Sequence, residues 1–120
     1  MMMTLFVFHI VMMDFRFVKI AVFVPASHAD AVRKALAEAG SGHIGQYDFC
    51  SFTSNGTGRF CPLKGSKPFF GVEGKIEEVE EERIEVICPR EILQKVLAAV
   101  RVAHPYEEPA IDVYPLLNEI

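Results

Sequence analysis

Residues 16–25 read RFVKIAVFVP. Apolar side chains fall on every second position, which is the period of a β-strand with one buried face. That face carries Val18, Ile20, Val22 and Val24, and the other carries Phe17, Lys19, Ala21 and Phe23. Because proline cannot donate a hydrogen bond to a sheet, we expect Pro25 to end the strand.

A helix is predicted directly after this strand. Ser27 and Asp30, three residues apart, resemble a capping box at its start, and Gly40 suits its end. The apolar residues at helical spacing are Val32, Ala35, Leu36 and Ala39, and those on the opposite face are Arg33, Lys34 and Glu38. The helix is therefore amphipathic and should pack on a sheet.

The middle of the chain is rich in glycine, with seven of the eight glycines between residues 42 and 74. This density predicts turns or close backbone approach. We expect a strand over 46–53, a tight turn at Asn55-Gly56 and a short strand over 58–62. Residues 63–71 are predicted to form a loop.

The last third repeats the pattern of the first. Residues 83–88 alternate and predict a strand, and Pro89 suits the first position of a helix. Pro105 should stop that helix. Its apolar residues are Ile92, Leu93, Val96, Ala99, Val100 and Ala103. The apolar segment 110–114 predicts a short edge or assembly strand that ends at Pro115.

The element order is strand, helix, strand, strand, helix, strand. This is the βαββαβ order of a ferredoxin-like α+β sandwich, here with an extra Gly-rich hairpin or loop. Two helices would cover one sheet face and leave the other open. Candidates for lining the open face are Phe15, Phe17, Phe23, Tyr47 and Phe49. An exposed apolar patch of this kind marks an interface, so we expect a homo-oligomer packed sheet against sheet.

Composition limits the function classes. A chain of 120 residues with 51% hydrophobic and 23% charged residues suits one folded domain and excludes a disordered tail. The net charge of −4 disfavours nucleic acid and anionic membranes as partners. Three cysteines without paired spacing fit a reducing compartment, so we expect a cytoplasmic protein.

Residues 1–13 are an apolar run. The run is too short for a membrane span and lacks the basic region and cleavage site of a signal peptide. We therefore predict an N-terminal extension or extra strand over 1–14 and a single domain over 15–118. The alternative is that translation begins at Met12 or Met13.

Four groups of residues could carry chemistry. The Gly-rich turns over 40–60, with Arg59, could cradle an anion, or they could be turns alone. The acidic run 77–91 is expected to be a solvated hairpin face, with a cation or partner site as the alternative. The segment 104–109, HPYEEP, could form a metal or small-ligand site, or a rigid proline-framed turn. A zinc or copper set could come from His43, Cys50, Cys61 and His104, although local ligand spacing is absent.

Three ordered motifs carry a resemblance to a known family. They are GSGHIGQYDFCSF (40–52), GTGRFCP (56–62) and HPYEEPAIDVYPL (104–116). Together they resemble the small domain inserted in the Nif-three-like proteins, also called YqfO-like or GTP cyclohydrolase type 2-like. The resemblance covers about residues 17–116. It implies a ferredoxin-like fold akin to CutA and to P-II signalling proteins, which are trimers.

The same resemblance limits the activity that can be expected. The dinuclear metal centre of the full-length relatives uses His, Asp and Glu ligands in domains that flank the insert. Those domains lie outside this sequence, so the resemblance implies no metal-dependent hydrolase activity for it.

We predict a non-enzymatic, trimeric module that binds a small ligand or divalent metal at clefts between subunits, or regulates a protein partner. Ligand-binding candidates are Gly42, His43, Tyr47, Arg59 and Tyr106. Metal-ligand candidates are His43, Cys50, His104 and Glu107, with zinc or copper as the ion. No catalytic residue is predicted. The alternatives are a small metal-dependent hydrolase and a purely structural assembly domain.

Overall fold

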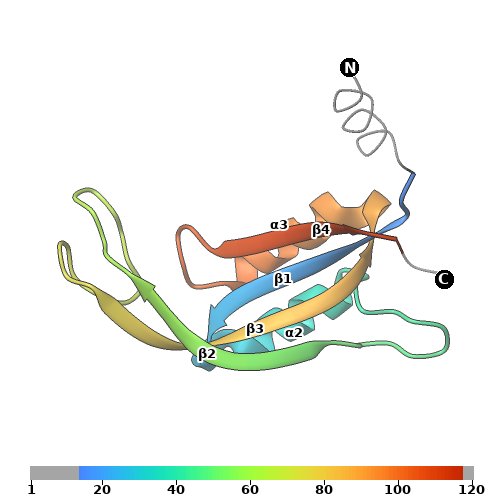
Figure 1. Ribbon diagram of the computed structural model, residues 1–120, viewed down its shortest axis with the longest axis horizontal. Helices are drawn as coiled ribbons and strands as arrows, with labels where there is room; N and C mark the ends of the chain where they lie inside the picture. The colour runs from blue at the N-terminus through green and yellow to red at the C-terminus, as the bar shows by residue number, and fades with distance from the viewer. Residues whose placement is uncertain (1–13, 118–120) are drawn as a thin grey trace, which may run out of the picture.

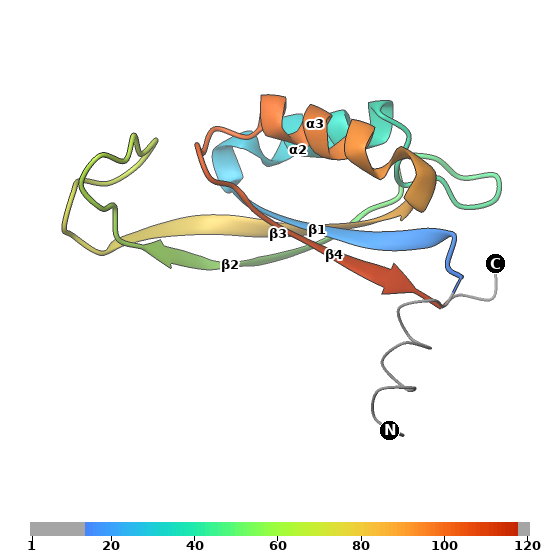
Figure 2. The same cartoon turned by 90° about the horizontal axis from the view of Figure 1, so that it is seen from above.

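The computed structural model describes residues 14–117, which form a four-stranded antiparallel sheet in the order β2-β3-β1-β4 (Figure 1). Both α-helices cover one face of the sheet (Figure 2). The strands are β1 (Phe17–Pro25), β2 (Phe52–Phe60), β3 (Glu77–Pro89) and β4 (Ala110–Leu116), and the helices are α2 (Ala29–Glu38) and α3 (Leu93–Ala103). Short 3-10 turns, η1 (Ala26–His28) and η2 (Arg90–Ile92), precede the two helices. The predicted βαββαβ fold is confirmed.

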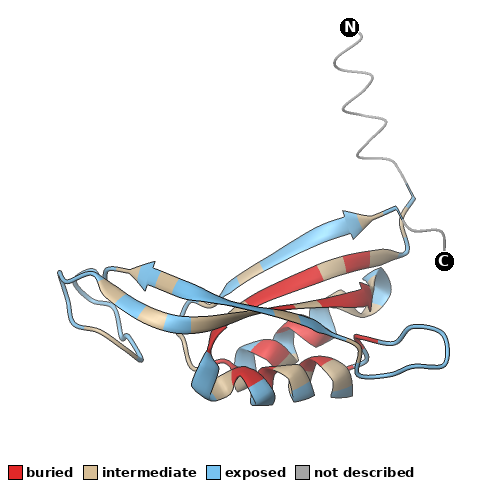
Figure 3. Ribbon diagram, turned by 60° about the horizontal axis from the view of Figure 1, so that its bottom comes forward, coloured by how far each residue is buried: buried red, intermediate tan, exposed pale blue. Residues whose placement is uncertain are grey.

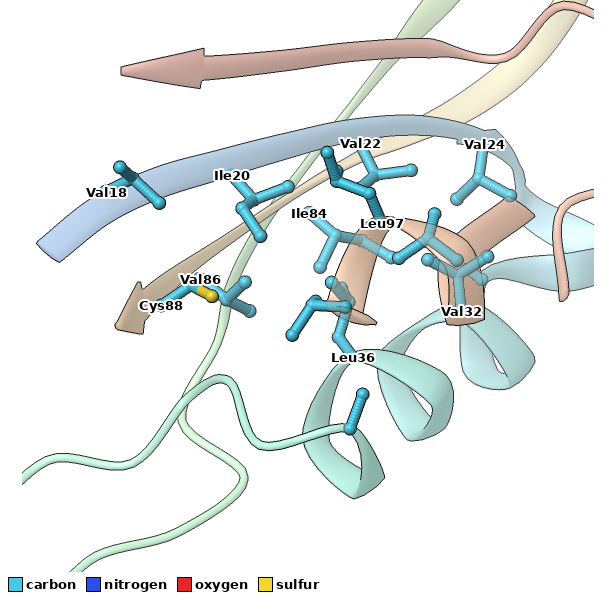
Figure 4. Close-up of a cluster of buried hydrophobic side chains, with 14 residues drawn as sticks. Val18, Ile20, Val22, Val24, Val32, Leu36, Ile84, Val86, Cys88 and Leu97 are labelled. Atoms are coloured by element: carbon cyan, nitrogen blue, oxygen red, sulfur yellow. The ribbon is translucent and has the colours of Figure 1, made fainter. Parts of the chain in front are cut away.

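The core lies between the helices and the inner face of the sheet. The face of β1 predicted to be buried is buried, with Val18, Ile20, Val22 and Val24 each at most 2% exposed. These side chains meet Ile84 and Val86 of β3, Val32 and Leu36 of α2, and Val96, Leu97 and Val100 of α3 (Figure 4). The alternating apolar residues of β1 therefore identify, from sequence alone, one side of the core.

No helix within residues 14–117 covers the other face of the sheet, which we call the outer sheet face (Figure 2). Directly paired residues share a face, so the β1 register assigns side chains to it. Its apolar members include Phe17, Phe23, Phe52, Phe60, Ile87, Tyr114 and Leu116, and its charged members are Lys19, Glu77, Glu81, Arg83, Glu85 and Asp112. Buried residues concentrate on β1, β3 and the helices, whereas β2 and β4 are mostly exposed or intermediate (Figure 3). The face is thus a mixed apolar and charged surface.

Three of the residues predicted to line this face lie elsewhere. Phe15 packs against the core cluster, with the Arg90 guanidinium 4.2 Å from its ring centroid. Tyr47 and Phe49 lie in the exposed α2–β2 loop. Their alternation predicted a strand, but the loop instead folds on itself through the Ile44–Tyr47 bridge. Of the five, only Phe17 and Phe23 belong to the outer face.

The predicted division of β2 is wrong. Residues 52–60 form one continuous strand, and Asn55 and Gly56 pair with Glu82 and Glu81 in its middle. Pairing along β3 therefore overrides the local turn preference of Asn-Gly, which acts only where two strands must reverse. Residues 46–51, predicted to begin the strand, belong to the α2–β2 loop.

For α2, the predicted C-terminal end is confirmed and the predicted N-terminal cap is not. At the C-terminus of α2, Gly40 has φ +114°, and the Ser41 and Gly40 amides donate to Leu36 and Ala37 in a Schellman pattern. At the N-terminus, the described residues provide no side-chain cap, so the predicted capping box is wrong. Ser27 Oγ instead lies 2.8 Å from His28 Nδ1.

Pro89 was predicted to begin the second helix. It ends β3 instead, and the 3-10 turn that leads into α3 starts at Arg90. Among residues 14–117, no helix has the length and hydropathy that a membrane crossing requires. Of the extension or extra strand predicted over 1–14, residues 1–13 lie outside the described residues.

Candidate functional site

A cavity of about 390 Å³ lies between the β2–β3 loop and the segment that joins α3 to β4. Its described lining is mainly apolar and aromatic: Phe23, Phe60, Phe69, Tyr106, Pro62, Leu63, Pro68, Cys61, Gly58 and Ala110. Its described charged lining residues are Arg59, Lys67, Glu81, Glu107 and Glu108. The sequence candidates Arg59, Tyr106 and Glu107 are thus neighbours around one hollow, which we call the loop pocket.

His104 holds the α3–β4 segment against the end of β1. The Tyr106 amide donates to His104 Nδ1 at 3.1 Å, so Nδ1 is the acceptor and the ring is neutral. Nε2 then carries the hydrogen and donates to the Phe23 carbonyl oxygen at 2.7 Å. Burial lowers the pKa of His104, opposed by the Phe23 carbonyl and Glu81. A metal ion could reach this ring only by replacing one of the two hydrogen bonds.

This neutral histidine should make stability depend on pH. His104 has an ordinary pKa near 6.5 in the unfolded chain and a lower one when folded, so acid favours the unfolded state. Unfolding free energy should therefore be constant from this group above about pH 6.5 and fall below it, by at most about 1.4 kcal/mol per pH unit.

Urea unfolding of the wild type and of His104→Gln at several pH values measures this effect. Glutamine does not titrate, so the variant should lose that part of the slope, whereas His43→Gln, at an exposed histidine, should keep it. Equal slopes for the wild type and His104→Gln would contradict the neutral assignment.

Tyr106 joins the α3–β4 segment to β3. Its hydroxyl donates to Glu81 Oε2 at 2.9 Å, and its ring meets Phe60 edge-on at 5.8 Å between centroids. Burial and the Glu81 carboxylate raise the pKa of Tyr106, so the hydroxyl stays protonated. Gly58 makes this arrangement possible, because a Cβ there would collide with the Glu81 carboxylate.

Glu107 ties the same segment to the β2–β3 loop. Its Oε1 accepts a hydrogen bond from the Lys67 amide at 2.9 Å. The loop is closed at its base by the Gly74 amide, which donates to the Pro62 carbonyl oxygen at 2.9 Å. Phe69 packs edge-on against His28, 5.3 Å between centroids, which connects the loop tip to the start of α2. The pocket walls are therefore held by contacts to β1, β2, β3 and η1.

The other sequence candidates lie at the opposite end of the sheet. Gly42, His43, Tyr47 and Cys50 belong to the α2–β2 loop, which emerges beside the end of β3, far from the segment 104–109 (Figure 1). His43 Nδ1 lies 3.9 Å from Asp48 Oδ1, and Cys50 lines a second hollow of about 230 Å³. One chain therefore separates the predicted ligand residues into two groups.

The predicted metal ligands are divided in the same way. His43 and Cys50 lie in the α2–β2 loop, whereas His104 and Glu107 line or adjoin the loop pocket. Within residues 14–117 of a single chain, no three His, Cys, Asp or Glu side chains gather closely enough to hold a metal ion. A site built from all four candidates needs more than one copy.

Sequence reasoning missed several pocket walls. Phe23 was assigned to an open sheet face, and Phe60, Phe69 and Glu81 were not singled out for the site. They come from β1, β2, the β2–β3 loop and β3, so no local motif groups them. The one available signal was Gly58, a strand glycine, which often marks close approach by another group.

Comparisons with known sequences find relatives of this chain but no matching family model. No protein-family model matches the chain. A GTP cyclohydrolase 1 type 2 homolog of Halalkalibacterium halodurans is 54% identical over 101 residues, which are 84% of this chain and 27% of the relative. The chain therefore spans about a quarter of the length of the curated relatives it matches.

Solved structures place the similarity in the same region. A Bacillus cereus protein related to NIF3 matches with TM-score 0.75 and 52% identity, over 87% of this chain and 26% of that one. The periplasmic divalent cation tolerance protein CutA of Archaeoglobus fulgidus matches with TM-score 0.62 and 22% identity over 87% of both chains. Bacillus subtilis GlnK, at TM-score 0.59 and 16% identity, covers 88% of this chain and 89% of its own, so the fold is CutA- and P-II-like. The chain is homologous to the insert region, about 100 residues long, of the GTP cyclohydrolase 1 type 2 homologs, which are related to NIF3.

Proposed function

We propose that this chain is a non-enzymatic, self-associating binding module of the cytoplasm, which takes a small ligand in the loop pocket. The observation that carries the proposal is the pocket itself. Its volume of about 390 Å³ lies in the range of roughly 300–1,000 Å³ typical of small-molecule sites, and its walls are mainly apolar with a few polar groups.

The position of the pocket would couple ligand binding to the self-association that we propose. Phe23, Glu81 and Ala110 line the pocket and also belong to the outer sheet face. A second copy packed on that face would therefore adjoin the pocket and form the intersubunit cleft. We propose a trimer, because a trimer is the assembly that the resemblance to CutA and P-II proteins implies.

Light scattering on a sizing column tests the assembly. A trimer at micromolar concentration should have a mass of about 40 kDa, three times the 13.4 kDa of one chain. A monomer would overturn the shared cleft.

Alkylation of the cysteines by iodoacetamide tests ligand binding at the pocket. Cys61 lines the pocket and is exposed, whereas Cys50 lies in the distant α2–β2 loop. Cys88 is buried, and burial raises the pKa of its thiol to about 11, so it should stay unlabelled. A bound small molecule should slow the labelling of Cys61 relative to that of Cys50.

Three soluble probes of different charge serve for this test: benzyltrimethylammonium, benzyl alcohol and phenylacetate. Protection of Cys61 by any one of them supports binding at the pocket. Equal labelling of Cys61 with and without all three would overturn the proposed binding function and leave an assembly domain.

A divalent ion, zinc or copper, is the second ligand that we propose. His43 and Cys50 are at least partly exposed on one loop and carry ligand types suited to these ions. A neighbouring copy would complete the site. Metal analysis of protein purified without an affinity tag should find bound zinc or copper. Protein without either metal, and without a thermal shift when they are added, would overturn the metal site.

A further inference from the structure

The loop pocket combines aromatic rings with excess negative charge. Phe60, Phe69 and Tyr106 contribute rings to its walls, as does Phe23, whose ring already has the Arg83 guanidinium 5.4 Å from its centroid. The faces of such rings carry negative partial charge and attract cations, most strongly where water is displaced. The rings therefore favour a ligand that is both apolar and positively charged.

The ionic groups of the pocket favour the same charge. The described lining contains the carboxylates of Glu81, Glu107 and Glu108 and the cations of Arg59 and Lys67. Arg59 Nε is already paired at 3.0 Å with Glu78, a carboxylate outside the lining. Its charge is thereby compensated, which leaves the carboxylates of the lining in excess over the Lys67 ammonium.

In two of these carboxylates, one oxygen accepts a hydrogen bond that holds the side chain in place, and the other oxygen is available to a ligand. Glu81 Oε2 accepts from the Tyr106 hydroxyl, and Glu107 Oε1 accepts from the Lys67 amide. Within residues 14–117, the other oxygen of each carboxylate accepts no hydrogen bond. These oxygens can accept from an ammonium group or lie beside a substituted one.

From these features we infer that the loop pocket binds a monovalent organic cation, a substituted ammonium with an apolar body. The inference rests on the proposed binding function and names its ligand class. The rings contact the apolar body and the cationic centre, and the carboxylates supply the counter-charge. A bare metal ion fits less well, since the pocket is walled mostly by carbon and the described residues form no metal-ligand cluster.

Cys61 alkylation with the three probes distinguishes this inference from the function on which it rests. Benzyltrimethylammonium should protect Cys61 at a concentration about fivefold or more below that of benzyl alcohol, and phenylacetate should protect least. If benzyl alcohol or phenylacetate protects as well as the cation, the ligand class is wrong while the binding function stands. If no probe protects, the binding function fails first.

Two variants test the residues that carry the inference. Glu108→Gln removes one exposed carboxylate of the lining and should raise the half-protecting concentration of the cation about two- to fivefold, with benzyl alcohol unaffected. Phe69→Leu removes a ring and should weaken the cation by a similar factor. Glu91→Gln, an exposed carboxylate beside α3 and outside the pocket, is the matched control and should change nothing. Unchanged cation protection in both pocket variants would refute the assignment.

Discussion

Tyr114→Asp should convert the assembled protein to monomers. Tyr114 pairs with Lys19 across the β4–β1 ladder and is 42% exposed on the outer sheet face of a single chain. A second copy packed on this face would bury the new carboxylate, and even beside Lys19 the loss of hydration on burial costs several kcal/mol per ion. The dissociation constant should rise more than about 100-fold, as measured by light scattering over a dilution series.

Tyr47→Asp is the matched control for this variant. Tyr47 is also an exposed tyrosine, but it lies in the α2–β2 loop rather than on the sheet. It should leave the mass of the assembly unchanged, and circular dichroism should show both variants folded. If Tyr114→Asp retains the wild-type mass while folded, the outer face is not the interface.

Gly42→Ala should destabilise the fold by about 3 kcal/mol. Gly42 is buried at φ +79°, where a side chain costs about 1–2 kcal/mol in backbone strain. A Cβ there would also lie 2.7 Å from the Cys50 carbonyl oxygen, too close without backbone movement. That movement would disturb the Gly42 amide, which donates to the Ile87 carbonyl oxygen at 2.7 Å.

Gly45→Ala separates the two costs. Gly45 has φ +58° in the same loop, but a Cβ there would have no neighbour within 4 Å among the described residues. This variant should therefore lose only about 1–2 kcal/mol from strain, as measured by urea unfolding. Equal losses for the two variants would show that the close approach of Gly42 to Cys50 does not contribute.

The difference between Gly42 and Gly45 shows what could and could not be predicted from the glycine-rich sequence. The glycine density of residues 42–74 correctly predicted close backbone approach, and Gly42 meets Cys50 in this way. The prediction of Gly42 as a ligand residue remains untested, while its described contacts are to the backbone of Cys50 and Ile87. A high glycine content therefore indicates that some backbone atoms approach closely, but it does not identify which group approaches which glycine.

The elements themselves were predictable where a local period matched a buried face. The apolar residues that alternate along β1 and those that recur at helical spacing along α3 are the residues buried in the core. Both elements could therefore be predicted from sequence. The continuity of β2 could not be predicted, because Asn55-Gly56 resembles a turn locally and is extended only through its pairing with β3.

The site was partly predictable for a related reason. His104, Tyr106 and Glu107 lie within four consecutive residues of the sequence, and Tyr106 and Glu107 line the loop pocket. Glu81 could not be assigned, since its partner Tyr106 lies 25 residues away and the acidic run around it favoured a solvated surface. Contacts of this kind depend on the fold, which brings the α3–β4 segment against β3.

Glu81 and Phe23 both line the loop pocket and lie on the outer sheet face. In an assembly built on that face, a ligand that shifts these two side chains would also alter the contacts between subunits. Thermodynamic linkage then requires reciprocity: a ligand that favours the assembled form must bind more tightly as the protein becomes more concentrated. The occupancy of the pocket would then depend on the concentration of the protein as well as on that of the ligand.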